Sequence, residues 1–549
     1  MTRIFKKEFV FFVCLFCVSL LLAPAVYALE YHIGDKTLYV MGYGEQYVRF
    51  GMSGTTHSND GSYITSASRK GLMDGMFSLY TWQHLKWSDS LEFRTSFRYE
   101  GDWLSYAVNS GDHNDFDPIR PSRHNMRSDD HTKQIVRECN VAYFSRYLNV
   151  KIGKQTVAWG QTDLFRLMDM INPIDYRRMY ILRDSDYGYA ESRVPLWIAK
   201  VEVFPEISIG DITGIALQFM ATLDTESKTQ FNIGPRNGGV WAFPVPADMP
   251  DLRPLGLGHL KDITIHDRRR SQSIDNATFA FRMAANWGNT FFTINFYHGW
   301  DDSPVLVRGP NFLHAQLSGN VADADGSGLG YGLNLQQIYH RKTCLGFTVS
   351  REMDFIRPFA QALHQPSNPT LRVEAYYRWN KPVATDWVEK IKTGANTKNW
   401  TMMLDGANAK EYRRRDILRY MVGWDWPMRI HFLNPHKEFF TTFQFIHAHR
   451  MNGGDFWNAP YHSKDPKDKF DVTGLVNTTY FHDLVRPQIA FTTDLNHNQA
   501  SLLKGSCRFW FGDHWRPEIG FMMITGKKDS SHGMFRHRDN IWLKVKYQF

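Results

Sequence analysis

The sequence predicts an all-β fold: a transmembrane antiparallel β-barrel of about 18 strands, with about 16 as an acceptable count, and one inward-folded loop. Three observations predict this fold class. Apolar and polar residues alternate with period two in segments near ten residues long, short and long connectors mostly alternate, and no run of about 20 apolar residues follows position 30. The chain of 549 residues is 43% hydrophobic and 15% aromatic, which excludes an unfolded polypeptide.

The N-terminal segment has the features of a targeting signal. Basic residues at positions 3, 6 and 7 precede an uncharged stretch over 9–22, and the small-residue pattern Val26-Tyr27-Ala28 follows. We expect residues 1–28 to be a signal peptide that is cleaved and residues 29–549 to form the barrel. The mature protein is then expected in the outer membrane of a bacterium.

The segment at 91–100 illustrates the alternation. Phe93 and Phe97 fall on one face of an extended chain, and Glu92, Arg94 and Arg98 fall on the other. An apolar face toward lipid and a charged face toward enclosed water fit this pattern. The same reasoning predicts strands at 38–52, 74–86, 91–104, 133–144, 148–158, 196–204, 213–223, 277–286, 290–300, 338–350, 371–380, 414–425, 438–450, 471–481, 486–494, 498–511, 515–525 and 539–549.

The connectors indicate how these strands are arranged. Bacterial barrels have short periplasmic turns and long outside loops. Two connectors, at 351–370 and near 496, do not follow the alternation. Closure is required because lipid provides no hydrogen-bond partner for an open sheet edge. Aromatic residues crowd the strand ends, as the girdles at the two lipid–water boundaries require, for example Trp82, Trp87, Trp287, Trp300, Trp424 and Trp426.

The C-terminal residues 541–549 carry an apolar side chain at every odd position and end in Phe549. This ending resembles the C-terminal signal of bacterial outer-membrane barrels. The resemblance implies that the last strand is recognised by the barrel-assembly machinery. The expected surroundings of the folded protein are outer-membrane lipid and lipopolysaccharide.

The connector after the strand at 148–158 is unusual because it mixes apolar residues with charged ones. Such a segment needs a surface to pack on, and we expect residues 160–194 to fold into the bore and form a constriction. Opposed charges there would orient polar or ionic solutes. The alternative is an outside loop held together by its own ion pairs. The candidate constriction and lumen residues are Trp159, Asp163, Arg166, Asp169, Asn172, Asp175, Arg177, Arg178, Arg183, Arg94, Arg98 and Arg372.

A family resemblance centres on the same region. The motif comprises Gly153-Lys154-Gln155, Trp159-Gly160, Asp169, Ile171-Asn172-Pro173-Ile174-Asp175 and Arg193-Val194-Pro195-Leu196-Trp197. It resembles that of the long Gram-negative outer-membrane barrels grouped as a domain of unknown function. Lys154 departs from the family, whose members generally carry Arg there. The resemblance implies a porin-like barrel with no agreed substrate and no established catalytic residues.

Other classes of function have little support in the sequence. The net charge of +8 is spread among interleaved acids and bases, so we expect no nucleic-acid binding. The sequence has no Walker loop, no H-E-x-x-H and no nucleophile elbow, and no C-x-x-C outside the expected signal peptide, so we expect no enzyme activity and no cofactor. His447 and His449 share one strand face, but no third ligand is evident nearby; we expect solvated lumen or rim histidines and no metal site.

The sequence therefore predicts a channel for diffusion of small polar or anionic solutes. The expected lumen face has more bases than acids, which predicts a mild anion preference; its bases are Arg94, Arg98, Lys151, Lys200, Arg282, Arg372, Arg378, Arg508, Lys544 and Lys546. One alternative is a FadL-like or efflux-partner barrel that passes hydrophobic compounds. A second alternative is a non-conducting barrel enzyme or structural protein.

Overall fold

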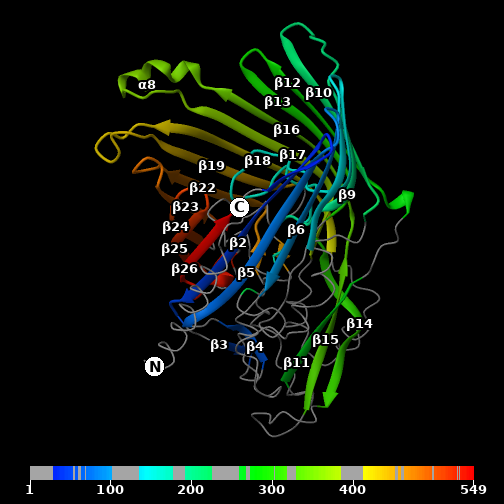
Figure 1. Ribbon diagram of the computed structural model, residues 1–549. Coiled ribbons are helices and arrows are strands. Elements are labelled where there is room, and N and C mark those ends of the chain that lie inside the picture. Colours follow the sequence, from blue (N-terminus) through cyan, green and yellow to red (C-terminus); the bar gives the residue numbers. More distant parts are fainter. Residues whose placement is uncertain are drawn as a thin grey trace.

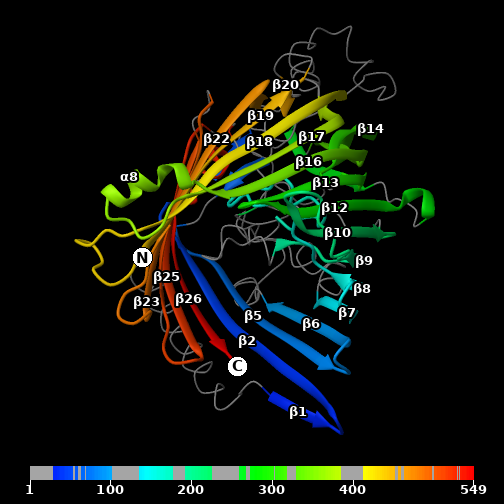
Figure 2. The same cartoon turned by 90° about the horizontal axis from the view of Figure 1, so that it is seen from above.

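In the computed structural model, nineteen antiparallel strands form one sheet, and eighteen of them close into a barrel (Figure 1; Figure 2). The structure describes residues 29–53, 56–59, 63–67, 70–101, 135–176, 192–224, 241, 259–267, 273–301, 303–317, 329–384, 412–451, 456–458, 463–496, 500–527, 530 and 532–549. The expected signal peptide, residues 1–28, lies outside the described residues.

The ring runs in chain order around the barrel. Its strands are β2 (Lys36–Gly51), β5 (Gly71–Lys86), β6 (Leu91–Gly101), β7 (Val136–Phe144), β8 (Leu148–Gln155), β9 (Leu196–Val203), β10 (Ile212–Thr222), β12 (Thr278–Trp287), β13 (Thr290–Trp300), β16 (Arg341–Glu352), β17 (Thr370–Ala384), β18 (Tyr412–Met428), β19 (Phe439–Arg450), β22 (Asp468–Asn477), β23 (Val485–Asp494), β24 (Ser501–Phe509), β25 (Trp515–Thr525) and β26 (Asn540–Gln548). Each expected strand overlaps one of these eighteen, which confirms the predicted fold class.

The remaining strands and helices do not belong to the ring of eighteen strands. Strand β1 (Leu29–Ile33) pairs with the start of β2. Hairpins and a small sheet are formed by β3 (Thr56–Asn59), β4 (Tyr63–Ala67), β11 (His259–Asp267), β14 (Val305–Leu317), β15 (Leu329–Ile338), β20 (Phe456–Asn458) and β21 (Ser463–Asp465). The helices are α8 (Arg357–Ala362) and short 3-10 turns at Ile274–Asn276, Asp354–Ile356 and Gly533–Phe535. None of the helices in the described part of the chain is both long enough and apolar enough to cross a membrane.

The first and last strands of the ring close the barrel. Val48 of β2 lies opposite Leu543 of β26, within an antiparallel register that runs from Tyr43 to Gly51. The two backbone hydrogen bonds between Gly42 and Phe549, each 2.9 Å, continue this pairing to the last residue. Every strand edge of the ring therefore has a partner, as a barrel in lipid requires.

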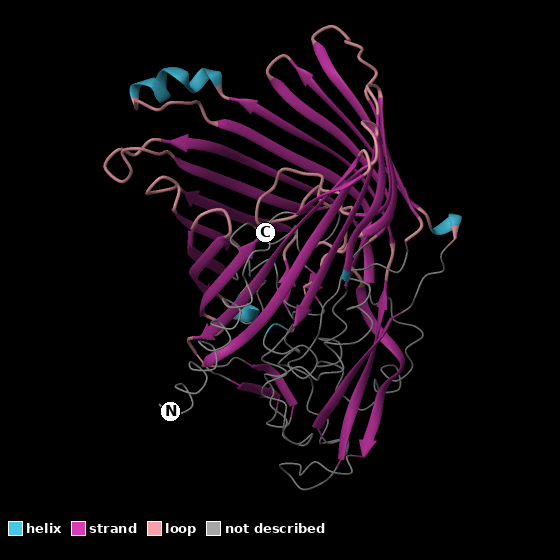
Figure 3. Ribbon diagram, in the orientation of Figure 1, coloured by secondary structure: helices cyan, strands magenta, loops and turns pink. Residues whose placement is uncertain are grey.

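Short and long connections lie at opposite ends of the barrel. In Figure 1, α8 lies at the short-turn end, and β3, β4, β11, β14 and β15 lie at the other end. In Figure 3 the turns between neighbouring strands at the α8 end are drawn in pink. The connector at 351–370 is a short-turn-end connection that contains α8, and the one near 496 is a tight link at the long-connection end. Both exceptions to the alternation thus keep the expected topology.

Side chains alternate between the two faces of the wall. On β13, Ile294 and Phe296 are 41% and 38% exposed on the outside, whereas Thr293 and Asn295 are buried on the inside. Trp287, the last residue of β12, is 63% exposed at the short-turn end. An apolar outer face with a polar inner face is the arrangement that a barrel in a bilayer requires.

Candidate functional site

The connection between β8 and β9 leaves the wall and runs inside the bore. We call residues 156–176 of this connection the crossing segment. Trp159 and Met168 are each 1% exposed, and their neighbours are inward-facing side chains of the wall. This confirms the inward-folded loop for residues 160–176 of the predicted segment 160–194; residues 177–191 lie outside the described residues.

The crossing segment begins against β10. The indole Nε1 of Trp159 donates a hydrogen bond of 2.7 Å to Oε1 of Gln218. The ring belongs to a buried apolar cluster on the inner face of β9 to β16, whose members are Val157, Trp159, Met168, Met170, Ile171, Leu196, Ile198, Met220, Ala280, Tyr297 and Cys344. Burial of this cluster provides the apolar surface that the segment needs.

A buried carboxylate on β17 fixes the next turn. Glu374 is fully buried, and its oxygens accept hydrogen bonds of 2.5 Å from the backbone N–H groups of Gln161 and Met168. Gly160 lies beside it with φ of +95°, and a Cβ there would come within 3.0 Å of Glu374 Oε1 and 3.1 Å of the Asp169 nitrogen. A glycine is therefore needed at this position for both backbone conformation and space.

Asp163 ties the segment to β17, β18 and β19. Nη2 of Arg372 donates hydrogen bonds of 2.6 Å to Asp163 and to Asp425. The same Nη2 also donates to the hydroxyl of Thr442 at 2.9 Å, and Gln444 donates to Asp163 at 2.8 Å. One guanidinium therefore faces two carboxylates, which leaves one net negative charge at this site next to the wall.

Asp169 holds the middle of the segment. Its Oδ2 accepts from Arg193 Nη2 at 2.8 Å and lies 3.5 Å from Arg166 Nε. Asn172 accepts from the N–H of Val157 at 2.7 Å and donates to the carbonyl of Val194 at 2.9 Å. These bonds join the start and the end of the connection. Asp169 and Asn172 therefore stabilise the segment and do not face open water.

The far end of the crossing segment reaches the opposite wall. Leu167 packs with Met421 of β18 and Ile446 of β19. Tyr176 instead packs against a cluster formed mainly by β2, β5 and β24 to β26, which contains Tyr47, Met73, Trp241, Leu502, Met522, Ile524, Met534, Phe535 and Trp542. The segment therefore spans the bore from β10 and β17 to the strands that close the ring.

A second inward-packing element was missed in the sequence. The connection from β25 to β26 contributes Met534 and Phe535 to this cluster. Arg538 is 1% exposed, donates to the carbonyl of Met534 at 3.0 Å and lies over the Phe535 ring at 4.9 Å; burial lowers the pKa of its guanidinium to about 9. The apolar pair Met534-Phe535 within a polar connector was the available signal.

The other predicted residues occupy different places. Arg94 pairs with Glu92 at 2.7 Å, and Arg98 lies 3.9 Å from Glu100. The backbone N–H of Asp175 donates to the carbonyl of Ser192 at 2.7 Å, and its side chain is 2% exposed. Arg177, Arg178 and Arg183 lie outside the described residues.

Most of the expected lumen bases are paired with carboxylates. Eight of the ten have a carboxylate oxygen within 4.0 Å: Arg94, Arg98, Lys200, Arg372, Arg378, Arg508, Lys544 and Lys546. The other two, Lys151 and Arg282, form no ion pair with any acid in the part of the chain that the structure describes. Paired charges contribute little net field, so Lys151 on β8 and Arg282 on β12 are the expected lumen bases whose charge is least compensated by direct contact.

The chain matches a family model and resembles known barrels distantly. The model described as "Protein of unknown function (DUF1302)" matches residues 77–549 and confirms the resemblance carried by the motif around Trp159. No curated protein matches the chain. Among solved structures, OpdK of Pseudomonas aeruginosa is 7% identical with a TM-score of 0.42, covering 94% of this chain and 100% of its own.

Two further barrels give similar values. OpdQ of Pseudomonas aeruginosa is 7% identical with a TM-score of 0.40, covering 94% of this chain and 99% of its own. The outer-membrane channel DcaP of Acinetobacter baumannii is 8% identical with a TM-score of 0.36, covering 95% of this chain and 100% of its own. These low values carry no inference about solutes, and the fold rests on the strand register of this chain itself.

Proposed function

This chain belongs to the DUF1302 family of proteins of unknown function, and we propose that it is a porin-like channel in the outer membrane of a Gram-negative bacterium. Small polar or anionic solutes would diffuse through it. The observation that supports this most is the path of the crossing segment, which begins against Gln218 of β10 and ends with Tyr176 against the strands that close the ring. A segment that crosses a wide bore narrows the passage through the barrel without closing it.

The anchoring of the segment supports a fixed constriction. Asp163 and Glu374 hold the segment at two points on β17 to β19, and Asp169 holds its middle. A constriction held at fixed anchors discriminates by size and polarity, because its rigid apolar and hydrogen-bonded parts do not move aside for bulky or apolar solutes.

The charge of the inner wall supports a weak preference for anions. Lys151 and Arg282 are the two expected lumen bases without a carboxylate partner among the described residues, and they lie on the same wall, on β8 and β12. Positive charges without a direct ion pair, beside a narrowed passage, raise the local concentration of anions. Because the other bases are paired, the preference should be mild.

Reversal potentials test the proposal. The full-length protein is reconstituted in planar bilayers with a potassium chloride gradient, and the wild type should conduct with a small anion preference. The Lys151→Gln/Arg282→Gln double variant should shift the reversal potential toward cations. Lys437→Gln is the matched control, because Lys437 lies in an exposed short turn, 3.3 Å from Asp483, and should leave the potential unchanged. Absence of conductance, or cation selectivity of the wild type, contradicts the proposal.

A further inference from the structure

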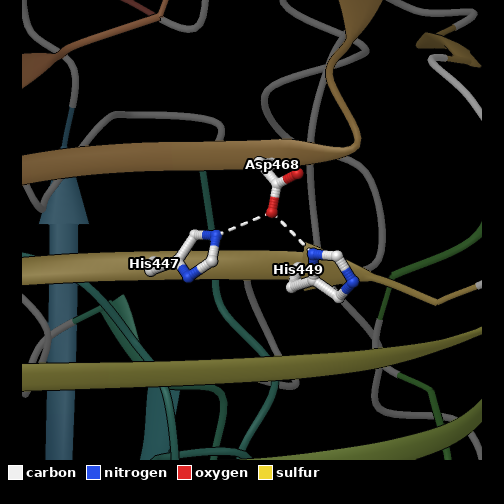
Figure 4. A group of neighbouring side chains, drawn as sticks. All are labelled: His447, His449 and Asp468. Atoms are coloured by element: carbon white, nitrogen blue, oxygen red, sulfur yellow. Dashed lines mark hydrogen bonds and ion pairs between the residues drawn. The ribbon is translucent and has the colours of Figure 1, made fainter.

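Two histidines and an aspartate meet on the outer face of the barrel, where the sequence predicted solvated lumen or rim histidines without a third ligand. His447 and His449 lie on β19, and Asp468 begins β22 (Figure 4). Of the two expected positions, lumen and rim, the histidines occupy the rim and point outward. The structure corrects the expectation on the third ligand, because Asp468 lies beside both histidines.

The face follows from the alternation on β19. Gln444 points inward, because it contacts Asp163 of the crossing segment, and Ile446 packs inward against Leu167. His447 and His449 have the opposite parity and therefore point outward. On β22, Phe470 lies opposite His447, and Asp468 lies opposite His449. The antiparallel register thus places the carboxylate on the same outer face as both imidazoles.

The three ligand atoms are already close together. Oδ1 of Asp468 lies 2.9 Å from Nε2 of His447 and 2.6 Å from Nδ1 of His449, and all three ligand atoms lie within 4.8 Å of one another. An ion bound at about 2.0–2.2 Å from imidazole nitrogen and carboxylate oxygen holds its ligand atoms at comparable separations. Small side-chain rotations would bring the three atoms around one ion.

Neighbouring aromatic groups orient His447. The Tyr420 hydroxyl lies 3.1 Å from its Nδ1, and the Phe470 ring stacks on the imidazole with centroids 4.4 Å apart and planes at 10°. When Nδ1–H donates to Tyr420, the lone pair of Nε2 is available to a metal. A hydrogen bond to the second ring nitrogen is what metal-binding histidines usually have, because it fixes the tautomer and the ring orientation.

The site is accessible from outside. The side chains of His447, His449 and Asp468 are 14%, 28% and 40% exposed. Asp468 is the first residue of β22, and Arg450, just after His449, is the last residue of β19, so the cluster lies at the long-connection end of the wall. Solvated ions can therefore reach it without entering the bore.

We propose that His447, His449 and Asp468 bind a divalent transition-metal ion, with Zn²⁺ as the best match. Two imidazoles and one carboxylate suit borderline ions such as Zn²⁺, whereas Ca²⁺ and Mg²⁺ prefer sites made of oxygen ligands. Three protein ligands leave a fourth position for water or for a group from outside. Because β19 and β22 are joined through a long connection, the ion would clamp their outer ends together.

The test measures zinc binding by the full-length protein without a histidine tag. The protein is folded in detergent micelles, stripped with a chelator and titrated with zinc chloride by calorimetry at pH 7.5. We expect one ion per chain in the wild type. The single variants His447→Gln, His449→Gln and Asp468→Asn should each weaken binding about tenfold or more. Binding should also fall at pH 5, because protons compete for the imidazoles.

His298→Gln is the matched control. His298 lies on the outer face of β13 near the same end, and its Nδ1 lies 2.9 Å from the Thr343 hydroxyl. This variant should bind zinc as the wild type does. X-ray absorption at the zinc edge should show two imidazole ligands. The proposal is overturned if the wild type binds no more zinc than Asp468→Asn, if His298→Gln loses the ion equally, or if Ca²⁺ at the same concentration displaces zinc.

Discussion

Arg372 and Asp163 are joined by a hydrogen bond of 2.6 Å although 209 residues separate them in the chain. The bond links the barrel wall to the crossing segment, and the same guanidinium nitrogen also binds Asp425 at 2.6 Å. One arginine shared by two acids is therefore one of the anchors that position the segment in the bore.

Arg372→Gln should loosen the crossing segment more than Asp163→Asn does. Removal of the arginine leaves Asp163 and Asp425 close together without a compensating charge, at a cost of about 2 kcal/mol or more. Asp163→Asn keeps the pair of Arg372 with Asp425. The readouts are the midpoint of thermal unfolding and the current noise of single channels, and Arg372→Gln should show the lower midpoint and the larger noise.

A surface pair provides the control for this comparison. Arg429 and Glu438 lie 3.4 Å apart near the short-turn end and are largely solvated. Arg429→Gln should change stability by less than about 1 kcal/mol. Equal effects of Arg372→Gln and Arg429→Gln would mean that the segment is not anchored through Arg372.

Gly160→Ala should be more damaging than Gly288→Ala. Both glycines have positive φ, +95° and +54°, so both variants carry backbone strain of about 1–2 kcal/mol. At Gly160 the new Cβ also meets Glu374, whereas at Gly288 it has no neighbour within 4 Å. Thermal unfolding in detergent should separate the two variants, and equal losses would show that contact with Glu374 is unimportant.

Gly42→Val should impair closure of the barrel. A Cβ at Gly42 would come within 2.5 Å of the Tyr80 carbonyl oxygen and 2.6 Å of Cζ of Phe549, so the C-terminal ring could not lie where it does. We propose that the assembly machinery recognises this end of the chain, and the variant should yield less heat-modifiable protein on gels. Gly44→Val, where nothing lies within 4 Å, should fold as the wild type does.

Stability should fall as the pH is lowered from 6.5 toward 4. Burial, with a smaller contribution from Lys469, lowers the pKa of His532 from 6.5 to about 4. The unfolded chain therefore takes up a proton in this range before the folded chain does, which favours unfolding. Above pH 6.5 His532 is neutral in both the folded and the unfolded chain and does not weaken the fold. Its destabilising effect grows as the pH falls toward 4.

His532→Asn should flatten this part of the pH profile. The measurement is the unfolding midpoint between pH 7.5 and 4 for the wild type and for two variants. His482→Asn, in an exposed turn between β22 and β23, should keep the slope of the wild type. A slope unchanged in His532→Asn would assign the acid sensitivity to another group.

Some features of the inner wall were predictable from sequence because they are local. The alternation at 91–100 places Phe93 outside and Arg94 inside through the pleat alone. The same parity was available on β19, where Phe443 and Phe445 precede His447 and His449 at odd positions. Reading the two histidines as continuing that row of aromatics would have placed them on the outer face.

The sequence by itself determined the barrel class, a count of about 18 strands, their order along the chain and the side of the wall that most strand residues occupy, because these depend on a two-residue repeat and on connector length. Tertiary structure alone decided which distant groups meet: Glu374 with Met168, Tyr176 with the closing strands, and Asp468 with His449. The physical reason is that such contacts depend on strand register and on the path of a connection through the bore. Neither leaves a periodic signal in the chain.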